Sequence, residues 1–130
     1  MAGHPSLIVD GMNVIGSEPD GWWRDRGRAR RRLVADLARL ADGGTGVTVV
    51  FDGRATAGEE EEADGAPVHV AFAPGGPNAA DDAIVDMVRR LPHPEDTTVV
   101  TSDRALVERV RRWGAKVESA RSFRRRLGNA

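Results

Sequence analysis

Aspartates at the ends of apolar runs are the residues of this sequence best suited to chemistry. Asp10, Asp52 and Asp103 each follow a short run rich in β-branched residues. Such runs are typical of buried parallel strands, whose carboxyl ends meet at the edge where open α/β sheets hold their ligands. We therefore expect the three carboxylates at one rim. Asp10 is expected to be presented there and not buried, with Gly11 allowing a sharp turn after it.

A further pair of acids, Asp81 and Asp82, opens a predicted helix that follows the third strand and reaches the same rim. Acids in a first helical turn also complement the helix dipole, and aspartates at strand ends often form turns. Each residue alone therefore has a structural explanation, but the arrival of all of them at one edge favours a site. Several carboxylates in one cleft repel each other unless a cation neutralises them or some take up protons.

Carboxylate oxygens suit Mg²⁺ or Mn²⁺, and Mg²⁺ takes only one or two carboxylates directly while keeping several waters. The chemistry that fits is phosphodiester hydrolysis, in which one metal activates water and a second, ~3.5–4 Å away, stabilises the leaving oxygen. The sequence has no Walker loop and no Gly-x-Ser-x-Gly elbow. His4, His69 and His93 lack metal-ligand spacing, so we expect them at the surface.

Strands that alternate with helices must position these acids. We expect strands at residues 7–9, 47–51, 68–72, 97–101 and 116–118. We expect helices at about 28–42, 79–91 (with Asn78 as its cap), 103–113 and 120–127, and loops at 17–27 and 54–66. In the helix at 103–113, the expected core residues are Leu106, Val107, Val110 and Trp113. This alternation predicts an α/β fold, with a mainly parallel sheet of about five strands between two layers of helices.

The 130 residues suit one domain, which we expect to span residues 1–130. The chain has no cysteine, which excludes disulfides and thiolate metal sites. No apolar run approaches the ~20 residues of a membrane span, and residues 1–6 lack signal-peptide features, so we expect a soluble, cytoplasmic protein. Net charge is −1, but residues 104–130 carry nine basic and two acidic side chains. This asymmetry indicates either an electrostatic face or a set of solvated helix faces.

The motifs around these acids resemble the NYN domain, and most closely the YacP-like branch of that family, within the PIN-like nuclease superfamily. They are Asp-Gly-x-Asn-x-Ile-Gly at 10–16, Val-Val-Phe-Asp-Gly at 49–53, Ala-Asp-Asp at 80–82 and Val-Val-Thr-Ser-Asp at 99–103. The resemblance runs through nearly the whole chain, and the first and last motifs are the most specific. It implies a PIN-like, Rossmann-like α/β fold and divalent-metal ribonuclease activity, often endonucleolytic.

The resemblance also implies roles for individual residues. The acids that it makes catalytic are Asp10, Asp52, Asp81 and Asp103. The metal ligands that it implies are Asp10, Asp81, Asp82 and Asp103. The third motif usually reads Ala-Asp-Glu in that branch, so Asp82 is a shorter acid that can move or weaken a metal contact. Asn13 and Ser102 match polar motif positions, where they are expected to orient ligands or water.

RNA as the substrate rests mainly on the resemblance, and the sequence supplies side chains that can bind it. Arginines flank the first motif and close the chain, where they can neutralise phosphates. Those expected on RNA are Arg24, Arg28, Arg31, Arg124 and Arg125. Trp22 or Trp23 can stack on an unpaired base, worth ~1–3 kcal/mol, unless one is in the core and the other only partly exposed. The acidic stretch 59–64 would repel RNA, and we expect it to be disordered or to bind a basic partner such as a ribosomal protein.

Two other functions stay open. A non-catalytic RNA- or ribosome-binding module of the same fold would bind RNA without cleaving it, although the presence of all the principal acids favours an enzyme. A phosphatase or nucleotide-binding domain of similar topology is the third reading. An aspartyl phosphatase needs an Asp-x-Asp pair after the first strand, whereas Met12 stands two residues after Asp10.

Overall fold

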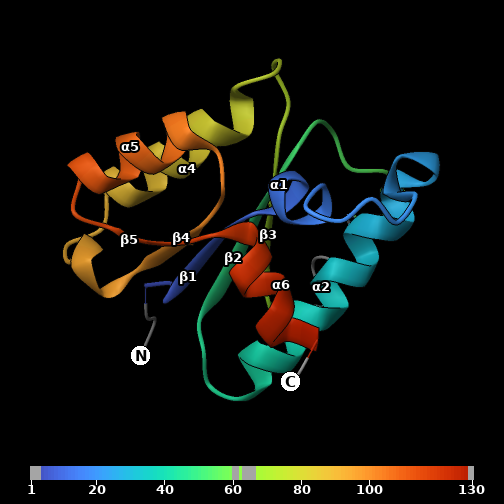
Figure 1. Cartoon of the computed structure of the whole chain (residues 1–130), viewed down its shortest axis with the longest axis horizontal. Coiled ribbons are helices and arrows are strands. Elements are labelled where there is room, and N and C mark those ends of the chain that lie inside the picture. The colour runs from blue at the N-terminus through green and yellow to red at the C-terminus, as the bar shows by residue number, and fades with distance from the viewer. Residues whose placement is uncertain (1–3, 60–61, 63–66, 129–130) are drawn as a thin grey trace.

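The computed structural model describes residues 4–59, 62 and 67–128, and strands alternate with helices along them (Figure 1). The strands are β1 (Leu7–Asp10), β2 (Val47–Asp52), β3 (His69–Ala73), β4 (Thr98–Val100) and β5 (Lys116–Glu118). The α-helices are α1 (Gly11–Ile15), α2 (Arg26–Asp42), α4 (Ala79–Arg89), α5 (Arg104–Arg112) and α6 (Ala120–Gly128). Two short 3₁₀ helices are η1 (Trp22–Arg24) and η2 (Pro94–Asp96).

The strands form one parallel sheet in the order β3-β2-β1-β4-β5, so β1 lies at its centre. Leu7 of β1 pairs with Val47 of β2 on one side and with Thr98 of β4 on the other. The chain runs outward from β1 through β2 to β3 and then returns to β4 on the opposite side of β1. The boundary between β1 and β4 is therefore the topological switch point, the place where open α/β sheets bind ligands.

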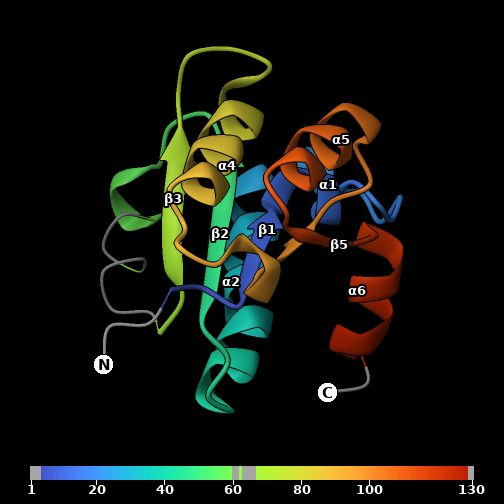
Figure 2. The same ribbon diagram turned by 90° about the vertical axis from the view of Figure 1, so that its left-hand side faces the viewer.

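Helices cover both faces of the sheet (Figure 2). One core cluster joins the sheet to α1, α2 and α6, and it includes the fully buried side chains of Leu37, Phe51 and Phe123. The other joins the sheet to α4 and α5 through residues such as Ile84 and Leu106. The predicted fold class, a five-stranded parallel sheet between two layers of helices, is thereby confirmed.

Short helices replace segments that were expected to be turn or loop. α1 follows β1 without an intervening residue, and η1 contains both Trp22 and Trp23. Packing of α1 against the core sustains a helix that would be unstable alone. α2 begins two residues earlier than expected, at Arg26, because the Asp25 carboxylate accepts a 3.0 Å hydrogen bond from the backbone N–H of Arg28.

Two expectations about side chains at helix ends are wrong or incomplete. Trp113, expected in the core, is 48% exposed, because it is the C-cap of α5 and lies beyond the last turn that buries Leu106 and Val110. Val107 is half-buried. Asn78 occupies the N-cap position of α4, but its side chain makes no capping hydrogen bond. In the part of the chain that the structure describes, no helix has the length and hydropathy needed to cross a bilayer.

Candidate active site

Asp10 stands at the end of the central strand, where β1 passes directly into α1. A Cβ atom at Gly11 would lie 2.4 Å from two ring atoms of Phe51 and 3.0 Å from the carbonyl oxygen of Val50. No side chain fits there without displacing β2, and Gly11 does not have a positive φ, so the glycine is required for close packing and not for a left-handed turn. The Asp-Gly pair thereby fixes Asp10 beside the switch point.

The Asp10 carboxylate is buried, at 5% exposed, which corrects the expectation that it would be presented at an open rim. The physical reason is that α1 continues from it at once and Thr101 bonds to it from the neighbouring strand end. Burial raises the pKa of Asp10 to about 6, against the opposing effect of the hydrogen bond from Thr101. Smaller contributions in the raising direction come from the negative charges of Asp81, Asp52 and Asp103.

Thr101 joins two of the predicted acids through one hydroxyl group. Its Oγ1 donates a 2.8 Å hydrogen bond to Oδ2 of Asp10 and accepts a 3.1 Å bond from the backbone N–H of Asp103. Asp103 is in turn the N-cap of α5, because its Oδ1 accepts a 3.1 Å bond from the N–H of Leu106. The ends of β1 and β4 and the start of α5 are therefore one hydrogen-bonded unit.

Asn13 and Ser102, predicted as supporting polar residues, hold the same two loops together. The side-chain Oδ1 of Asn13 accepts a 2.8 Å hydrogen bond from the backbone N–H of Ser102. The Ser102 hydroxyl oxygen accepts a 2.9 Å bond from the N–H of Ala120, at the start of α6. Asn13 thus bridges α1 to the β4–α5 connection, and Ser102 continues the bridge to α6.

The Asp52 carboxylate connects β2 to α4. Its Oδ1 accepts a 3.2 Å hydrogen bond from the backbone N–H of Ala80 in the first turn of α4, and the next residue is Asp81. Burial raises the pKa of Asp81, and the charges of Asp103 and Asp52 add to that effect while Arg109 lowers it. Four of the predicted acids, Asp10, Asp52, Asp81 and Asp103, therefore lie within electrostatic range of one another at one edge of the sheet.

Asp82 is placed differently from the other acids. Its Oδ1 accepts a 2.9 Å hydrogen bond from Nη1 of Arg109, and the pair joins α4 to α5. The Asp82 side chain is 66% exposed. This ion pair gives Asp82 a structural role in addition to its predicted metal contact.

The donor chemistry of the cluster suits a divalent cation, although the side chains do not form a compact ligand set. Among residues 4–59, 62 and 67–128, no three acidic or histidine side chains are close enough together to hold one metal ion. The donors are carboxylate oxygens, and burial, with smaller contributions from the charges of neighbouring acids, raises the pKa values of Asp10 and Asp81. A hydrated Mg²⁺ needs only one or two direct carboxylates. His4, His69 and His93 are exposed, as expected.

Two contributors to the site were missed by sequence reasoning. Thr101 was assigned only to a strand, although its place two residues before Asp103 is the signal that its hydroxyl belongs to the site. The backbone N–H of Ala80, which fixes Asp52, carries no sequence signal because any residue except proline supplies it. Both contacts depend on how strands far apart in the sequence come together.

The five arginines expected to bind RNA divide into two groups. Arg24, Arg28 and Arg124 line a groove of about 640 Å³ between α2, α6 and residues 18–25, which we call the α2–α6 groove. Arg31 and Arg125 do not line it. Trp22 lines the groove and packs partly on the core, whereas Trp23 is 51% exposed, so one tryptophan is partly core and the other exposed.

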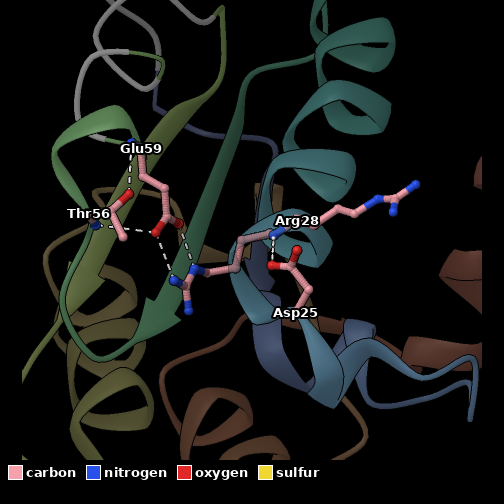
Figure 3. A network of polar contacts seen from close by, with 5 residues as sticks. Asp25, Arg28, Thr56 and Glu59 are labelled. Atoms are coloured by element: carbon pink, nitrogen blue, oxygen red, sulfur yellow. Dashed lines mark hydrogen bonds and ion pairs between the residues drawn. The ribbon is translucent and has the colours of Figure 1, made fainter.

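Glu59, the first residue of the acidic stretch 59–64, is buried and ion-paired (Figure 3). Residues 57–59 are helical within the expected loop, and Thr56 and Glu59 form a capping box through reciprocal 3.2 Å bonds. Nε and Nη2 of Arg30 in α2 also donate to the Glu59 carboxylate at 2.6 and 2.8 Å. Glu59 therefore anchors the β2–β3 connection, and its charge is paired with that of Arg30. The expectation for residues 60–61 and 63–64 lies outside the described residues.

A parallel five-stranded sheet with acids gathered at its switch point defines a PIN-like α/β domain. The chain belongs to the YacP-like NYN domain family, whose model matches residues 7–130. This membership implies a nuclease-type function related to RNA. No curated protein sequence matches the chain.

Solved structures of similar fold agree with this assignment. The crystal structure of Rae1 (YacP) from Bacillus subtilis has a TM-score of 0.73 and 28% identity, over 95% of this chain and 73% of that one. Its W164L mutant gives a TM-score of 0.74 at the same identity, over 95% and 74% of the two chains. An uncharacterized protein from Corynebacterium glutamicum shares the fold, with a TM-score of 0.54 and 22% identity over 95% and 89%.

Proposed function

We propose that this protein is a divalent-metal-dependent ribonuclease that cuts within RNA chains at the β1–β4 switch point. The observation that carries the proposal is the gathering of four acids, around a buried Asp10 whose pKa is raised to about 6. Confined negative charge of this kind is relieved by a bound cation. Membership in the YacP-like NYN domain family supports RNA as the substrate.

Mg²⁺ or Mn²⁺ is the cofactor that this donor set favours. The residues proposed to hold it are Asp10, Asp81, Asp82 and Asp103, with Asp52 completing the catalytic acids. When bound, such an ion supplies Lewis acidity to the phosphate and lowers the pKa of its own water. Because no three of the described acids are close enough together to hold one ion, we propose direct bonds from one or two carboxylates and water-mediated contacts from the others.

The chain itself contributes preorganised negative charge. Thr101 holds Asp10 by a 2.8 Å hydrogen bond, so the carboxylate does not have to be ordered when substrate arrives. The bond from the Ser102 N–H to Asn13 fixes the loops on either side of it. The proposed role of Asn13 and Ser102 is therefore to keep the acids at constant spacing, and that of Asp52 is to fix the start of α4.

Cleavage of a single-stranded RNA oligonucleotide labelled at one end tests the proposal. We expect internal fragments with Mn²⁺ or Mg²⁺ and none with EDTA. Asp10→Asn keeps the shape of the side chain and should slow cleavage about 100-fold or more. The matched control is Asp96→Asn, which makes the same chemical change at an exposed residue of η2, before β4 begins. Wild-type cleavage by Asp10→Asn would show that the acids are not the catalytic centre.

A second candidate is a non-catalytic module that binds RNA or the ribosome. The geometry of the cluster favours it, since no three acidic or histidine side chains of the described residues are arranged to hold one ion. This candidate predicts RNA binding that EDTA leaves unchanged, and no fragments with any divalent metal. Co-sedimentation of the protein with ribosomes through a sucrose gradient tests the ribosome as partner.

A further inference from the structure

The α2–α6 groove is separate from the acids but adjacent to them. α1 joins the two places: Asp10 precedes its first residue, and its last residue, Ile15, lines the groove. At 1.5 Å of rise per residue, this five-residue helix spans only about 7–8 Å. A ligand in the groove would therefore lie one short helix away from the acidic cluster. The groove volume of about 640 Å³ falls within the range of ligand pockets.

The acids that line the groove are already neutralised or engaged by contacts within the chain. Arg124 pairs with Glu18 at 3.0 Å and with Asp20 at 3.4 Å. Asp36 pairs with Arg39 at 2.9 Å. The remaining carboxylate, that of Asp25, caps α2. Among the arginines that line the groove, Arg39 and Arg124 are therefore used in pairs with its acids, and the other arginines carry its remaining positive charge.

Three further groove arginines, Arg24, Arg28 and Arg32, have no carboxylate within ion-pair distance in the described part of the chain. Arg28 and Arg32 stand four residues apart on α2, so they present their guanidinium groups on one face. Guanidinium groups bind phosphate oxygens through two parallel hydrogen bonds. The groove therefore offers a row of phosphate donors.

Aromatic and apolar side chains also line the groove. Trp22 lines the groove, with the guanidinium of Arg26 at 5.3 Å from its ring centroid and Trp23 edge-on at 6.0 Å between centroids. Ile15 and Leu33 add apolar surface. A charged row beside an aromatic wall is the arrangement by which proteins bind single-stranded nucleic acid, phosphates on one side and bases on the other.

We propose that the α2–α6 groove binds a single-stranded RNA segment next to the acidic cluster, with Arg28 and Arg32 on its phosphates and Trp22 facing its bases. The inference rests on the proposed function for the choice of RNA. It assigns the binding of substrate to Arg24, Arg28, Arg32 and Trp22, and it gives Arg31 and Arg125 no part in that binding.

Fluorescence anisotropy with a fluorescein-labelled, unstructured 12-nucleotide RNA tests the groove in EDTA, where binding is measured apart from cleavage. Arg28→Gln/Arg32→Gln should weaken binding about tenfold or more, and should lower the slope of log K against log salt by about 1.4 for two lost phosphate contacts. The matched control, Arg31→Gln/Arg125→Gln, removes the same charge outside the groove and should change binding less than twofold.

Equal weakening by the two double variants would show attraction to the general charge of the chain and would overturn the groove assignment, as would wild-type binding by Arg28→Gln/Arg32→Gln. An oligoglutamate of matched charge is the second probe. If it displaces RNA at equal concentration, the groove takes acidic peptides and the assignment to RNA is wrong. Because binding is measured in EDTA, the two proposals can fail separately. If the wild-type protein binds RNA but does not cleave it with a divalent metal, the ribonuclease is refuted. If it cleaves RNA but its binding does not depend on Arg28 and Arg32, this inference is refuted.

Discussion

The hydroxyl of Thr101 donates to the buried carboxylate of Asp10 at 2.8 Å, across the switch point of the sheet. The same oxygen accepts the N–H of Asp103 at 3.1 Å. A single side chain that was not among the predicted site residues therefore joins two of the acids that were. The hydrogen bond from Thr101 also lowers the pKa of Asp10, and so opposes the increase in pKa that burial causes.

Replacement of Thr101 by valine should raise the pKa of Asp10 above about 6. The variant keeps the shape of the side chain but removes the donor to Asp10 and leaves the N–H of Asp103 without its acceptor. We expect the free energy of unfolding to fall by about 1–3 kcal/mol. Carboxyl carbon NMR across a pH titration measures the pKa, and urea unfolding measures the stability.

Thr98→Val is the matched control for that experiment. Thr98 is the first residue of β4, the strand that ends one residue before Thr101, and within the described chain its side chain makes no hydrogen bond. This variant should leave the pKa of Asp10 unchanged and the stability within about 0.5 kcal/mol. An unchanged Asp10 titration in Thr101→Val would show that the hydroxyl does not hold the carboxylate.

Asp10→Asn should make the metal-free protein more stable at neutral pH. Between its usual pKa of 3.8 and about 6, Asp10 is protonated in the folded chain and ionised in the unfolded chain. The wild type therefore loses stability as pH rises through this window. One pKa unit equals about 1.4 kcal/mol, so the loss approaches about 3 kcal/mol above pH 6. Asparagine carries no such charge, and urea unfolding in EDTA measures the difference.

The pH profile separates this cause from a general effect of the substitution. The stability difference between Asp10→Asn and wild type should be largest at pH 7.5, shrink below pH 6 and nearly vanish below pH 4. Mn²⁺ should raise the melting temperature of the wild type and not of the variant. A difference that does not vary between pH 4 and 7, or a variant less stable at pH 7.5, would contradict the raised pKa of Asp10.

The sequence predicted those features that depend on short-range patterns. Runs rich in β-branched residues located β1, β2 and β4, and an acid at the end of β1, of β2 and beyond β4 located the edge of the site. Burial of Asp10 was not predictable, because it depends on Thr101, which is 91 residues away. Trp113 was misplaced because helical periodicity does not reveal that α5 ends before it.

The pattern of charges along the sequence predicted the positions of charged side chains poorly. The stretch 59–64 looks uniformly acidic, yet Glu59 is buried because Arg30, 29 residues earlier, supplies a bidentate partner. Arg28 and Arg31 look equivalent in sequence, but helix geometry places only Arg28 in the α2–α6 groove. Pairing between side chains distant in sequence decides these cases, and local composition does not encode it.

Removal of the Glu59 charge should destabilise the fold strongly. Glu59→Gln leaves the guanidinium of Arg30, whose side chain is 13% exposed, without a counter-charge, and we expect a loss of about 3 kcal/mol. The hydrogen bond from Arg30 lowers the pKa of Glu59. The stability from this pair is therefore present above the usual pKa of 4.5 and is lost as pH falls through the lower, folded value. Urea unfolding at pH 7 and in acid measures both effects.

Glu108→Gln is the control, because its partner Arg112 is 73% exposed and Glu108 itself is 71% exposed. An exposed pair of this kind contributes less than about 0.5 kcal/mol. If Glu59→Gln lowers the free energy of unfolding at pH 7 by no more than Glu108→Gln does, the β2–β3 connection is not anchored by Arg30.

Gly11→Ala tests whether the glycine after Asp10 is required for packing. The added Cβ would stand 2.4 Å from Cδ1 and Cε1 of Phe51, which is fully buried and cannot move aside freely. Overpacking of this kind costs about 1–3 kcal/mol and should shift β2 away from Asp10. Gly58→Ala adds the same methyl group at a helical position with no atom within 4 Å, and it should be neutral or slightly stabilising. Urea unfolding compares the two, and equal stabilities would show that β1 and β2 tolerate a side chain at this position.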